Sequence, residues 1–459
     1  MKTAAIHNLG CKVNAYEAES MEQMLSAAGY SIVPFAGQTP ADVCIINTCA
    51  VTNIADHKSR QMLHRARKLY PDSIVIAAGC YAQEQAESLA KDPSIDIVLG
   101  NNRKKDLIPI LESFTAARLE KKQMPDCQEP EEKHRALEVV EDISRDTDYE
   151  NLRLTQVRDH TRAYIKMQDG CNQFCSYCII PYLRGRIRSR AEADILQEIR
   201  GLAAKGFREF VLTGIHLTSY GSDDGSTSLI EVIEKVGKIP GVERIRLGSL
   251  EPRVITPDFV QRLAAVPAFC PHFHLSLQSG SDTVLKRMNR HYTTEEFARS
   301  VALLRKTFDR PAITTDIIVG FPQETEEEFQ ETLAFIRKIQ FYECHVFKYS
   351  RREGTAADRM DGQIPQDVKH RRSGILIEQA RELAHAYRLS FKDSVQDVLI
   401  EQTEEVNGKK YFTGLTGNYI KIYIPCGPQK CAAQITGSIR PVQLRDCFED
   451  GLAGTFVLV

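Results

Sequence analysis

Three cysteines are crowded into one short segment of the chain. They are Cys171, Cys175 and Cys178 of the run GCNQFCSYC, spaced C-x3-C-x2-C. Thiolates this close together can hold three corners of a [4Fe-4S] cluster, whereas the commoner cluster sites use four cysteines. The fourth iron would then be free for a substrate. The alternative is a zinc site that a distant His or Cys completes.

Three more cysteines share one kind of position in the first part of the chain. Cys11 follows the apolar run AAIHNLG, Cys49 follows DVCIINT and Cys80 follows SIVIAAG. If these runs are parallel strands, the thiols lie at the carboxyl edge of one sheet, where open α/β sheets place their ligands. The placement predicts a second metal site. The alternative is that they are small residues in tight strand-to-helix turns.

The remaining cysteines are interpreted as small apolar residues or surface residues rather than metal ligands. Cys127 lies in an acidic stretch. Cys426, Cys431 and Cys447 lie among strand-like residues, which argues against a zinc site formed by these three. This group comprises Cys44, Cys127, Cys270, Cys344, Cys426, Cys431 and Cys447.

Alternating strands and helices must position the two cysteine sets, so the sequence predicts an α/β protein. Residues 1–124 are predicted to be a small α/β domain with a parallel sheet. Residues 125–157 form an acidic linker, and 158–392 a partial (β/α) barrel with a long exit helix. Residues 393–459 are predicted to form a small antiparallel β-barrel. The expected barrel strands are Ala163–Gln168, Glu209–Leu217, Arg244–Leu250, His272–Gln278, Ile313–Val319 and His345–Tyr349.

The composition limits the possible classes of protein. Fifty-nine Lys and Arg against 61 Asp and Glu give a net charge of -2, which excludes a globally basic nucleic-acid binder. The apolar and charged fractions, 42% and 26%, are those of a folded globular chain. There is no secretory signal or membrane span, and the 13 cysteines are an odd number. We therefore expect a cytoplasmic protein whose thiolates bind metal.

The first cysteine set resembles that of the radical S-adenosylmethionine (SAM) enzymes, in which the free iron of a [4Fe-4S] cluster chelates SAM. The resemblance places Tyr177 near the adenine. LTGIH, containing Thr213 and Gly214, stands where many members carry a Gly-Gly-Glu motif that contacts the SAM amino group, so backbone at these two residues is the expected substitute. Ser249, Glu251 and Gln278 fall where the family lines its SAM pocket, although they can also be ordinary polar residues at strand ends.

The motifs GCKVN, NTCAVT and GCYAQ resemble, in order, those of the methylthiotransferases, a radical SAM subgroup. The resemblance implies that Cys11, Cys49 and Cys80 hold an auxiliary [4Fe-4S] cluster with an open iron that carries the sulfur. It also implies that the last domain is an RNA-binding TRAM module. Electrons would come from a donor such as a flavodoxin or ferredoxin, and the source of sulfur stays unknown.

Four arginines follow the first cysteine set directly, namely Arg184, Arg186, Arg188 and Arg190. Guanidinium groups suit phosphates. Because the substrate must lie beside the cluster, we expect these arginines to bind RNA. The alternative is a solvated surface that pairs with Glu192 and Asp194.

The resemblance implies a tRNA methylthiotransferase that adds a methylthio group to C2 of N6-threonylcarbamoyladenosine beside the anticodon. One SAM would methylate sulfide on the auxiliary cluster, and a second would be cleaved to a radical that removes the C2 hydrogen. GCKVNAYEAE and NTCAVTNIADHKSRQ favour this subgroup. The alternatives are a methylthiotransferase for isopentenyl-adenosine tRNA or for a ribosomal-protein aspartate, and a non-enzymatic Fe-S scaffold that binds RNA.

Overall fold

The computed structural model describes residues 2–37, 39–123, 135–157, 161–225, 227–426 and 435–457. Cys127 and Cys431 lie outside these residues. The chain forms two compact units. The first comprises Met1–Gln156, Lys166–Arg190 and Ser350–Thr355, and the second comprises Val157–Ile165, Ala191–Tyr349 and Ala356–Val459. Both cysteine sets therefore belong to the first unit, although the domain ranges predicted from the sequence separate them.

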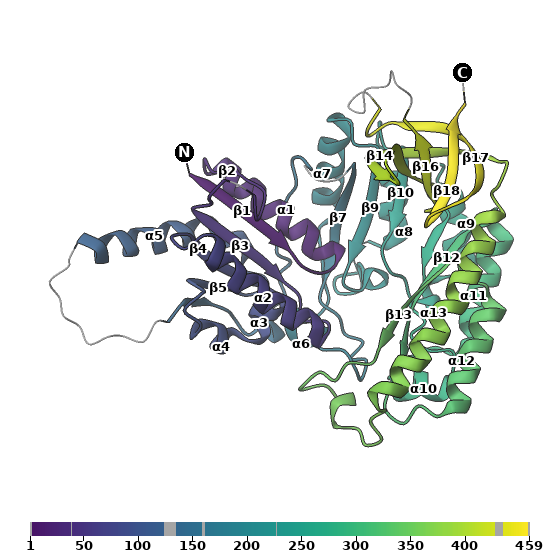
Figure 1. The fold of residues 1–459 in the computed structure, drawn as a ribbon, viewed down its shortest axis with the longest axis horizontal. Helices are drawn as coiled ribbons and strands as arrows, with labels where there is room; N and C mark the ends of the chain where they lie inside the picture. The colour runs from purple at the N-terminus through teal and green to yellow at the C-terminus, as the bar shows by residue number, and fades with distance from the viewer. Residues whose placement is uncertain are drawn as a thin grey trace. The chain divides into compact units, whose positions relative to one another are not determined.

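The first unit contains a parallel six-stranded sheet in the order β2-β1-β3-β4-β5-β6 (Figure 1). This confirms the small α/β fold predicted for the start of the chain. The elements are β1 (Thr3–Asn8), α1 (Lys12–Ala27), β2 (Ser31–Ile32), β3 (Val43–Thr48), α2 (Asn53–Leu69), β4 (Ile74–Gly79), α3 (Cys80–Glu84), α4 (Ala86–Ala90), β5 (Ile97–Leu99), η1 (Lys104–Asp106), α5 (Leu107–Gln123), β6 (Leu137–Val139) and η2 (Ile143–Arg145).

The two central strands of this sheet are buried along their whole length. Alternate residues of β3 pack into different apolar clusters: Cys44 and Ile46 into one, and Val43 and Ile45 into the other. A strand covered on both faces reads as a continuous apolar run. This is why β3 and β4 could be recognised from the sequence, and why Cys44 is an apolar core residue, as predicted.

The predicted acidic linker is wrong in its second half. Residues Leu137–Val139 form β6, which pairs in parallel with β5 at the edge of the sheet. Further on, Leu152 and Leu154 are buried, and the Glu150 carboxylate accepts a hydrogen bond from Lys105 N. A three-residue strand carries too few apolar positions to stand out from its charged surroundings. Residues 124–134 lie outside the described residues.

The partial barrel is built from two sheets, in the orders β10-β9-β7-β8 and β11-β12-β13. An isolated parallel bridge between Leu250 and Leu275 links strand ends of β10 and β11. The described strands and helices are β7 (Arg162–Asp169), α6 (Ile180–Arg184), β8 (Arg188–Ser189), α7 (Glu192–Ala204), β9 (Glu209–Gly214), η3 (Leu217–Ser219), α8 (Leu229–Val236), β10 (Arg244–Leu247), η4 (Pro252–Val254), α9 (Pro257–Ala264), β11 (His272–His274), α10 (Asp282–Arg287), α11 (Thr294–Thr307), β12 (Ala312–Val319), α12 (Glu326–Ile339), β13 (Glu343–Lys348), η5 (Ala357–Arg359) and α13 (Gln366–Leu389).

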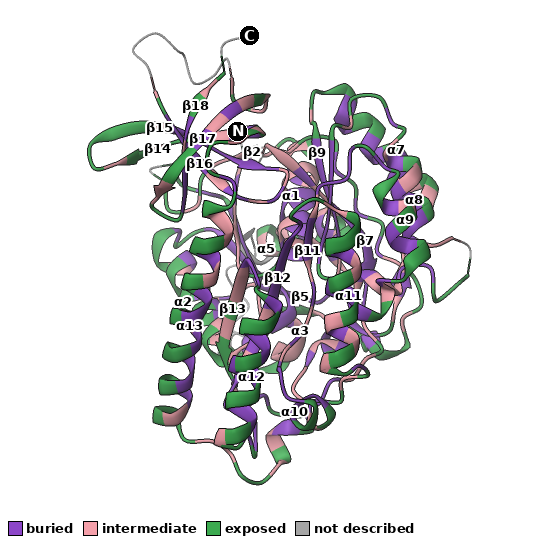
Figure 2. Ribbon diagram, turned by 90° about the vertical axis from the view of Figure 1, so that its right-hand side faces the viewer, coloured by how far each residue is buried: buried purple, intermediate pink, exposed green. Residues whose placement is uncertain are grey.

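The helices of the second unit begin and pack as their sequences predict. Thr293 and Thr325 start α11 and α12 with capping boxes, in which the glutamate three residues later returns a hydrogen bond to the cap. Along α13, Lys369, Arg372 and Leu376 are buried while the intervening positions are mostly exposed, so buried and exposed residues alternate along this helix (Figure 2). None of the described helices is long and apolar enough to span a membrane.

The end of the chain forms a closed five-stranded barrel, as predicted. Its order is β14-β15-β16-β18-β17, and its core includes Phe412, Ile422 and Val442. Arg244 and Arg246 of β10 donate hydrogen bonds to backbone oxygens of this barrel and to the buried carboxylate of Glu209. The strands are β14 (Val395–Val406), β15 (Lys409–Thr416), β16 (Lys421–Pro425), β17 (Ile439–Phe448) and β18 (Gly451–Phe456).

Candidate metal centres

Cys11, Cys49 and Cys80 lie at the carboxyl ends of three neighbouring strands. Cys11 is the N-cap of α1, Cys49 follows Thr48 at the end of β3, and Cys80 begins α3 directly after β4. The register aligns Asn8 of β1 with Asn47 of β3, and Thr48 with Gly79. The predicted shared edge is therefore confirmed. Burial, and then the neighbouring Cys80 and Cys11, raise the pKa of the Cys49 thiol.

Glycine precedes Cys11 and Cys80 because the chain turns sharply there. Gly79 has φ +91°, and a Cβ at this position would lie 2.6 Å from the Thr48 carbonyl oxygen. Gly10 has φ +121°, and a Cβ there would lie 3.3 Å from Cys49 Sγ. The same close approach that excludes side chains at these glycines brings the Cys49 thiol against the turn that carries Cys11.

Burial raises the pKa of the Cys49 thiol to about 11. A metal ion must therefore displace a proton from this group when it binds. The sulfur of Cys80 has different neighbours: Arg184 Nε donates to it over 3.3 Å and Asn101 Nδ2 over 3.8 Å. Two donors directed at one sulfur suit a metal-bound thiolate, because a thiolate accepts hydrogen bonds and cannot donate one. The donor set of this edge thus fits a thiolate-ligated cluster.

A buried network of five charged side chains connects the two cysteine sets within the first unit. Arg184 Nη1 lies 2.8 Å from Glu17 Oε1 and 3.1 Å from Asp169 Oδ1, and Arg184 Nη2 lies 2.8 Å from Asn14 Oδ1. Lys166 Nζ contacts Glu17 at 2.8 Å and Asp169 at 2.6 Å, and Lys104 Nζ lies 3.2 Å from Glu17. Asp169 is two residues before Cys171. One guanidinium therefore joins Cys80 to the strand that leads into the other set.

The cations keep both carboxylates ionised. Burial alone would raise the pKa of Glu17, but Arg184, Lys104 and Lys166 outweigh it and hold that pKa well below its usual value. Burial would likewise raise the pKa of Asp169, and here Lys166 and Arg184 lower it. Three cations face two carboxylates in this network. A Cys80 thiolate would supply the remaining negative charge.

Burial corrects the predicted RNA-binding role of three arginines. Arg184, Arg188 and Arg190 are each at most 1% exposed, and Arg190 lies over the ring of Tyr16 with its Nη1 3.1 Å from the hydroxyl oxygen. A guanidinium enclosed in this way presents no surface to an RNA phosphate. Arg186 is exposed and lies over the ring of Phe174, so its predicted contact with RNA stays a prediction.

Cys171, Cys175 and Cys178 occupy the loop between β7 and α6. Gly170 has φ +70°, and a Cβ there would overlap the carbonyl of Arg186, so this turn also requires glycine. The backbone N–H of Gln173 donates to Cys171 Sγ over 3.4 Å, and Cys178 N donates to Cys175 O over 2.9 Å. A backbone donor at the first sulfur fits a thiolate ligand. Tyr177 of this loop is half-buried, and its contact with adenine stays a prediction.

In the second unit, the residues predicted to line a SAM pocket lie at the carboxyl ends of β9, β10 and β11. Thr213 and Gly214 end β9, Ser249 is exposed just beyond β10, and Gln278 follows β11 with φ +71°. Barrel enzymes of this class place their ligands at this end of the strands. Their contacts with SAM stay predictions.

Glu251 is held in place by two partners, neither of which was predicted from the sequence. Arg290 Nη2 lies 3.0 Å from its Oε1, and His216 Nε2, from the LTGIH segment, lies 3.5 Å from its Oε2. Burial would raise the pKa of Glu251, but His216 and Arg290 lower it, so the carboxylate is ionised. Nothing in the spacing of Arg290 distinguishes it from a surface arginine. An ionised carboxylate in this position suits the ammonium group of an amino acid.

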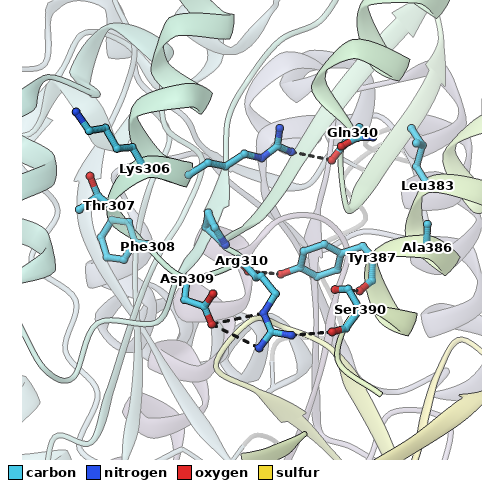
Figure 3. A pocket seen from close by; sticks show the side chains of 12 residues that line it. Lys306, Thr307, Phe308, Asp309, Arg310, Gln340, Leu383, Ala386, Tyr387 and Ser390 are labelled. Carbon is cyan, nitrogen blue, oxygen red and sulfur yellow. Dashed lines mark hydrogen bonds and ion pairs between the residues drawn. The ribbon is translucent and has the colours of Figure 1, made fainter. Parts of the chain in front are cut away.

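A large cavity of about 740 Å³ in the second unit lies away from these residues (Figure 3). Phe308, Arg310 and Pro311 line it just before β12 begins, together with Tyr387 and Ser390 of the α13 end. Arg310 Nη1 donates to Ser390 O, and Tyr387 donates to Arg310 O, so these groups bond to one another. The cavity is at the amino end of the barrel strands, opposite to the end where such barrels bind substrates.

Two family models match the chain. The Radical SAM superfamily matches residues 165–336, and the Uncharacterized protein family UPF0004 matches residues 3–100. Among solved structures, the radical S-adenosylmethionine methyltransferase TsrM from Kitasatospora setae superposes with a TM-score of 0.57 at 16% identity, over 78% of this chain and 77% of that one. That similarity shows the fold alone.

Curated relatives match over nearly the whole chain. The threonylcarbamoyladenosine tRNA methylthiotransferase MtaB of Bacillus subtilis is 39% identical over 424 residues, covering 92% of this chain and 90% of its own. Its counterpart in Thermotoga maritima is 35% identical over 98% of this chain and 96% of its own. A tRNA-2-methylthio-N(6)-dimethylallyladenosine synthase of Acetivibrio thermocellus is 35% identical over 91% and 85%. With two cysteine sets, a partial barrel and relatives of this extent, the chain belongs to the radical SAM methylthiotransferase family.

Proposed function

We propose that this enzyme adds a methylthio group to C2 of N6-threonylcarbamoyladenosine in tRNA. The presence of two separate three-cysteine sets in one compact unit carries the proposal, since sulfur transfer and radical generation each need a metal centre. Four relatives that are 35–39% identical to this chain are named as threonylcarbamoyladenosine enzymes, and dimethylallyladenosine synthases match it at 35–38% identity. The methylthiolation of dimethylallyladenosine is therefore the second candidate.

Two [4Fe-4S] clusters and SAM are the cofactors of the proposal. Cys171, Cys175 and Cys178 would hold the radical SAM cluster, and Cys11, Cys49 and Cys80 the auxiliary one. Such a cluster with SAM supplies a radical that can remove hydrogen from a carbon that acids and bases do not activate. A flavodoxin or ferredoxin is the proposed electron donor, and the enzyme would act in the cytoplasm, where thiolates stay reduced.

The chain's own side chains prepare both centres. Arg184 and Asn101 donate to Cys80 Sγ, and the backbone N–H of Gln173 donates to Cys171 Sγ, so these sulfurs have hydrogen bonds that stabilise the thiolate form. In the second unit, Arg290 and His216 hold the Glu251 carboxylate ionised and fixed in direction. Glu251 can then bind the ammonium group of SAM. In many radical SAM enzymes, the Gly-Gly-Glu motif that this chain lacks makes that contact.

The iron content tests the two-cluster part of this proposal. After anaerobic reconstitution, the wild-type chain should hold about eight irons, from two four-iron clusters. Replacing Cys11, Cys49 and Cys80 with Ala should leave about four and should spare the cleavage of SAM to 5'-deoxyadenosine while it stops methylthiolation. Replacing Cys44, a buried cysteine of β3, with Ala is the matched control and should keep the full iron content. Full iron in the triple variant would contradict a cluster at this edge.

The choice of nucleoside is tested with purified tRNA that carries either modification. A threonylcarbamoyl group brings a carboxylate that the dimethylallyl group lacks, and the exposed Arg186 is the cation that remains available in the arginine run. We expect turnover of threonylcarbamoyladenosine tRNA and none of dimethylallyladenosine tRNA. Equal turnover of the two, or activity on a ribosomal protein alone, would overturn the assignment.

A further inference from the structure

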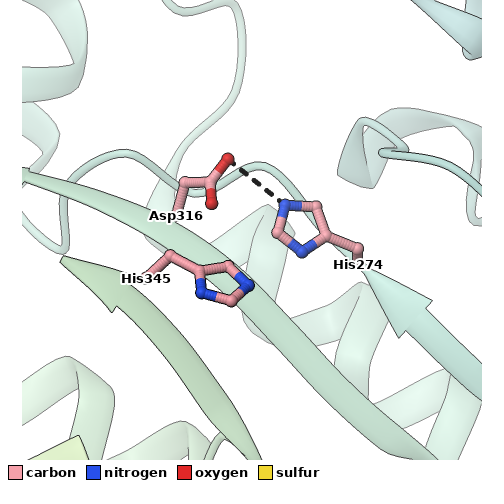
Figure 4. A group of neighbouring side chains, drawn as sticks. All are labelled: His274, Asp316 and His345. Atoms are coloured by element: carbon pink, nitrogen blue, oxygen red, sulfur yellow. Dashed lines mark ion pairs between the residues drawn. The ribbon is translucent and has the colours of Figure 1, made fainter. Parts of the chain in front are cut away.

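Two histidines and an aspartate face one another on three adjacent strands of the second unit, and none of the three is among the site residues predicted from the sequence. They are His274 of β11, Asp316 of β12 and His345 of β13. The backbone carbonyl of the aspartate accepts a hydrogen bond over 2.9 Å from the N–H of Gln278, one of the residues predicted to line the SAM pocket. One ligand atom from each lies within 4.8 Å of the others. Figure 4 shows the three side chains directed toward one another from their separate strands.

The parallel register explains why these residues meet. Asp316 pairs directly with His345, and His274 pairs with Thr314, which lies two residues before Asp316 and so on the same face of the sheet. This face is partly open: Asp316 is half-buried and His345 is exposed, whereas Thr315 and Ile317 on the other face of β12 are fully buried. An ion could therefore reach the three side chains without any opening of the core.

The separation of the His274 and Asp316 ligand atoms is compatible with two ligands of one metal ion. His274 Nε2 and Asp316 Oδ2 lie 3.3 Å apart. A charge-assisted hydrogen bond is usually about 2.7–2.9 Å long. Two ligand atoms that each lie about 2.0–2.1 Å from a tetrahedral metal ion are separated by roughly 3.3–3.4 Å. The observed separation of 3.3 Å matches one edge of such a coordination shell and is longer than a charge-assisted hydrogen bond.

The ring of His274 is also held as the ring of a metal ligand is held. Its Nδ1 lies 3.0 Å from Thr314 Oγ1, so the second ring nitrogen has a polar partner and Nε2 is directed at Asp316. Metal-binding histidines commonly use their other ring nitrogen in this way, which fixes the orientation and tautomer of the ring. The ring centroids of His274 and His345 are 5.9 Å apart, and one ring nitrogen of each lies within 4.8 Å of the other.

We propose that His274, Asp316 and His345 bind a divalent transition-metal ion, with Zn²⁺ as the probe. Two imidazoles and one carboxylate favour Zn²⁺ or Fe²⁺ over the oxygen-seeking Mg²⁺ and Ca²⁺. Three protein ligands leave at least one coordination position open to water or to an oxygen of a bound molecule. The site does not depend on the proposed nucleoside, because it is derived from the three side chains alone.

The test compares zinc binding by reconstituted full-length protein and by H345A. His345 is exposed, so its removal should leave the fold intact. After equilibrium dialysis against micromolar Zn²⁺, elemental analysis should show about one zinc per chain fewer in H345A and in D316A than in the wild type. H370A, which removes an exposed histidine of α13, is the control and should bind as much zinc as the wild type.

X-ray absorption at the zinc edge separates this site from zinc on cysteines. The zinc that H345A loses should have nitrogen and oxygen ligands with the scattering pattern of imidazole. Equal zinc contents in the wild type and H345A, or a difference made up of sulfur-bound zinc alone, would overturn the proposal.

Discussion

Replacing Arg184 with Met should destabilise the first unit specifically. The guanidinium contacts Glu17 at 2.8 and 3.2 Å, Asp169 at 3.1 Å, Asn14 at 2.8 Å and Cys80 Sγ at 3.3 Å, all of them buried. Removing one member of a buried ion-pair network typically costs about 3–5 kcal/mol, because the carboxylates left behind are buried without their partner. Lys104 and Lys166 still face Glu17 in the variant. We therefore expect the lower end, about 3 kcal/mol.

Hydrogen exchange followed by mass spectrometry measures this loss within one unit. A chain of two compact units need not unfold in one step, so a single melting temperature would mix their contributions. Opening of β3 and β4 should become about a hundredfold more frequent in R184M, the factor that about 3 kcal/mol corresponds to. Peptides from α13, which belongs to the other unit, should exchange at the wild-type rate.

R186M is the matched control, because Arg186 lies two residues further along the same segment and is exposed. It should leave exchange in β3 and β4 unchanged. If R184M were also unchanged there, or if α13 lost protection to the same degree, the buried network would not be what stabilises the first sheet. R184M should in addition retain less iron at the Cys11, Cys49 and Cys80 edge, since Cys80 loses a hydrogen-bond donor.

Three further outcomes follow from single side chains. Burial would raise the pKa of Glu209, but Arg246, Arg244 and Arg162 outweigh burial and lower it. The ionised Glu209 therefore contributes its full stabilisation above the usual carboxyl pKa of about 4.3. This stabilisation is lost as the pH falls through the lower pKa that Glu209 has in the folded protein. The stability difference between the wild type and E209Q, measured by hydrogen exchange in peptides from β9 and β10, should thus shrink below about pH 4.5. A constant difference would contradict the ionised state. R186A should weaken tRNA binding and reduce the log-log salt slope by about one, with R299A, at an exposed position of α11, as the control. Unchanged affinity and slope would make Arg186 an ordinary surface residue. G79A should lose iron from the Cys80 edge because its Cβ would lie 2.6 Å from Thr48 O, whereas G206A, at φ +95° with no atom within 4 Å of the added Cβ, should keep it.

The strands and their cysteines could be predicted because each depends on local sequence. A run such as VCIINT is apolar throughout, and the cysteine after it inherits a defined place at the sheet edge. The role of Arg184 could not be predicted in this way. Its partners Glu17 and Asp169 lie 167 and 15 residues away, and a buried arginine looks the same in a sequence as an exposed one. Arg186, two residues later, has the opposite environment.

Contacts between side chains of neighbouring strands could not be predicted from the sequence either. The proposed ion ligands His274, Asp316 and His345 belong to separate strand-like runs, and their spacing in the sequence matches no metal-binding motif. Only the register, which sets Asp316 beside His345, shows that they meet. The short strand β6 was not predicted, because Leu137 and Val139 are its only large apolar residues.

The composition of the first unit bears on the order in which the chain folds during synthesis. Glu17 depends on Lys166 and Arg184, and Asp56 and Glu84 both contact Arg352, which lies in the segment Ser350–Thr355. A fragment that ends at residue 156 would keep Lys104 as the single partner of Glu17 among these cations and would lack Arg352 altogether. Domains generally fold as units while the ribosome delivers them from the N-terminus. Here the N-terminal α/β domain cannot complete its ion pairs until residue 352 has emerged, so iron should enter the set of Cys11, Cys49 and Cys80 only after most of the chain has been made.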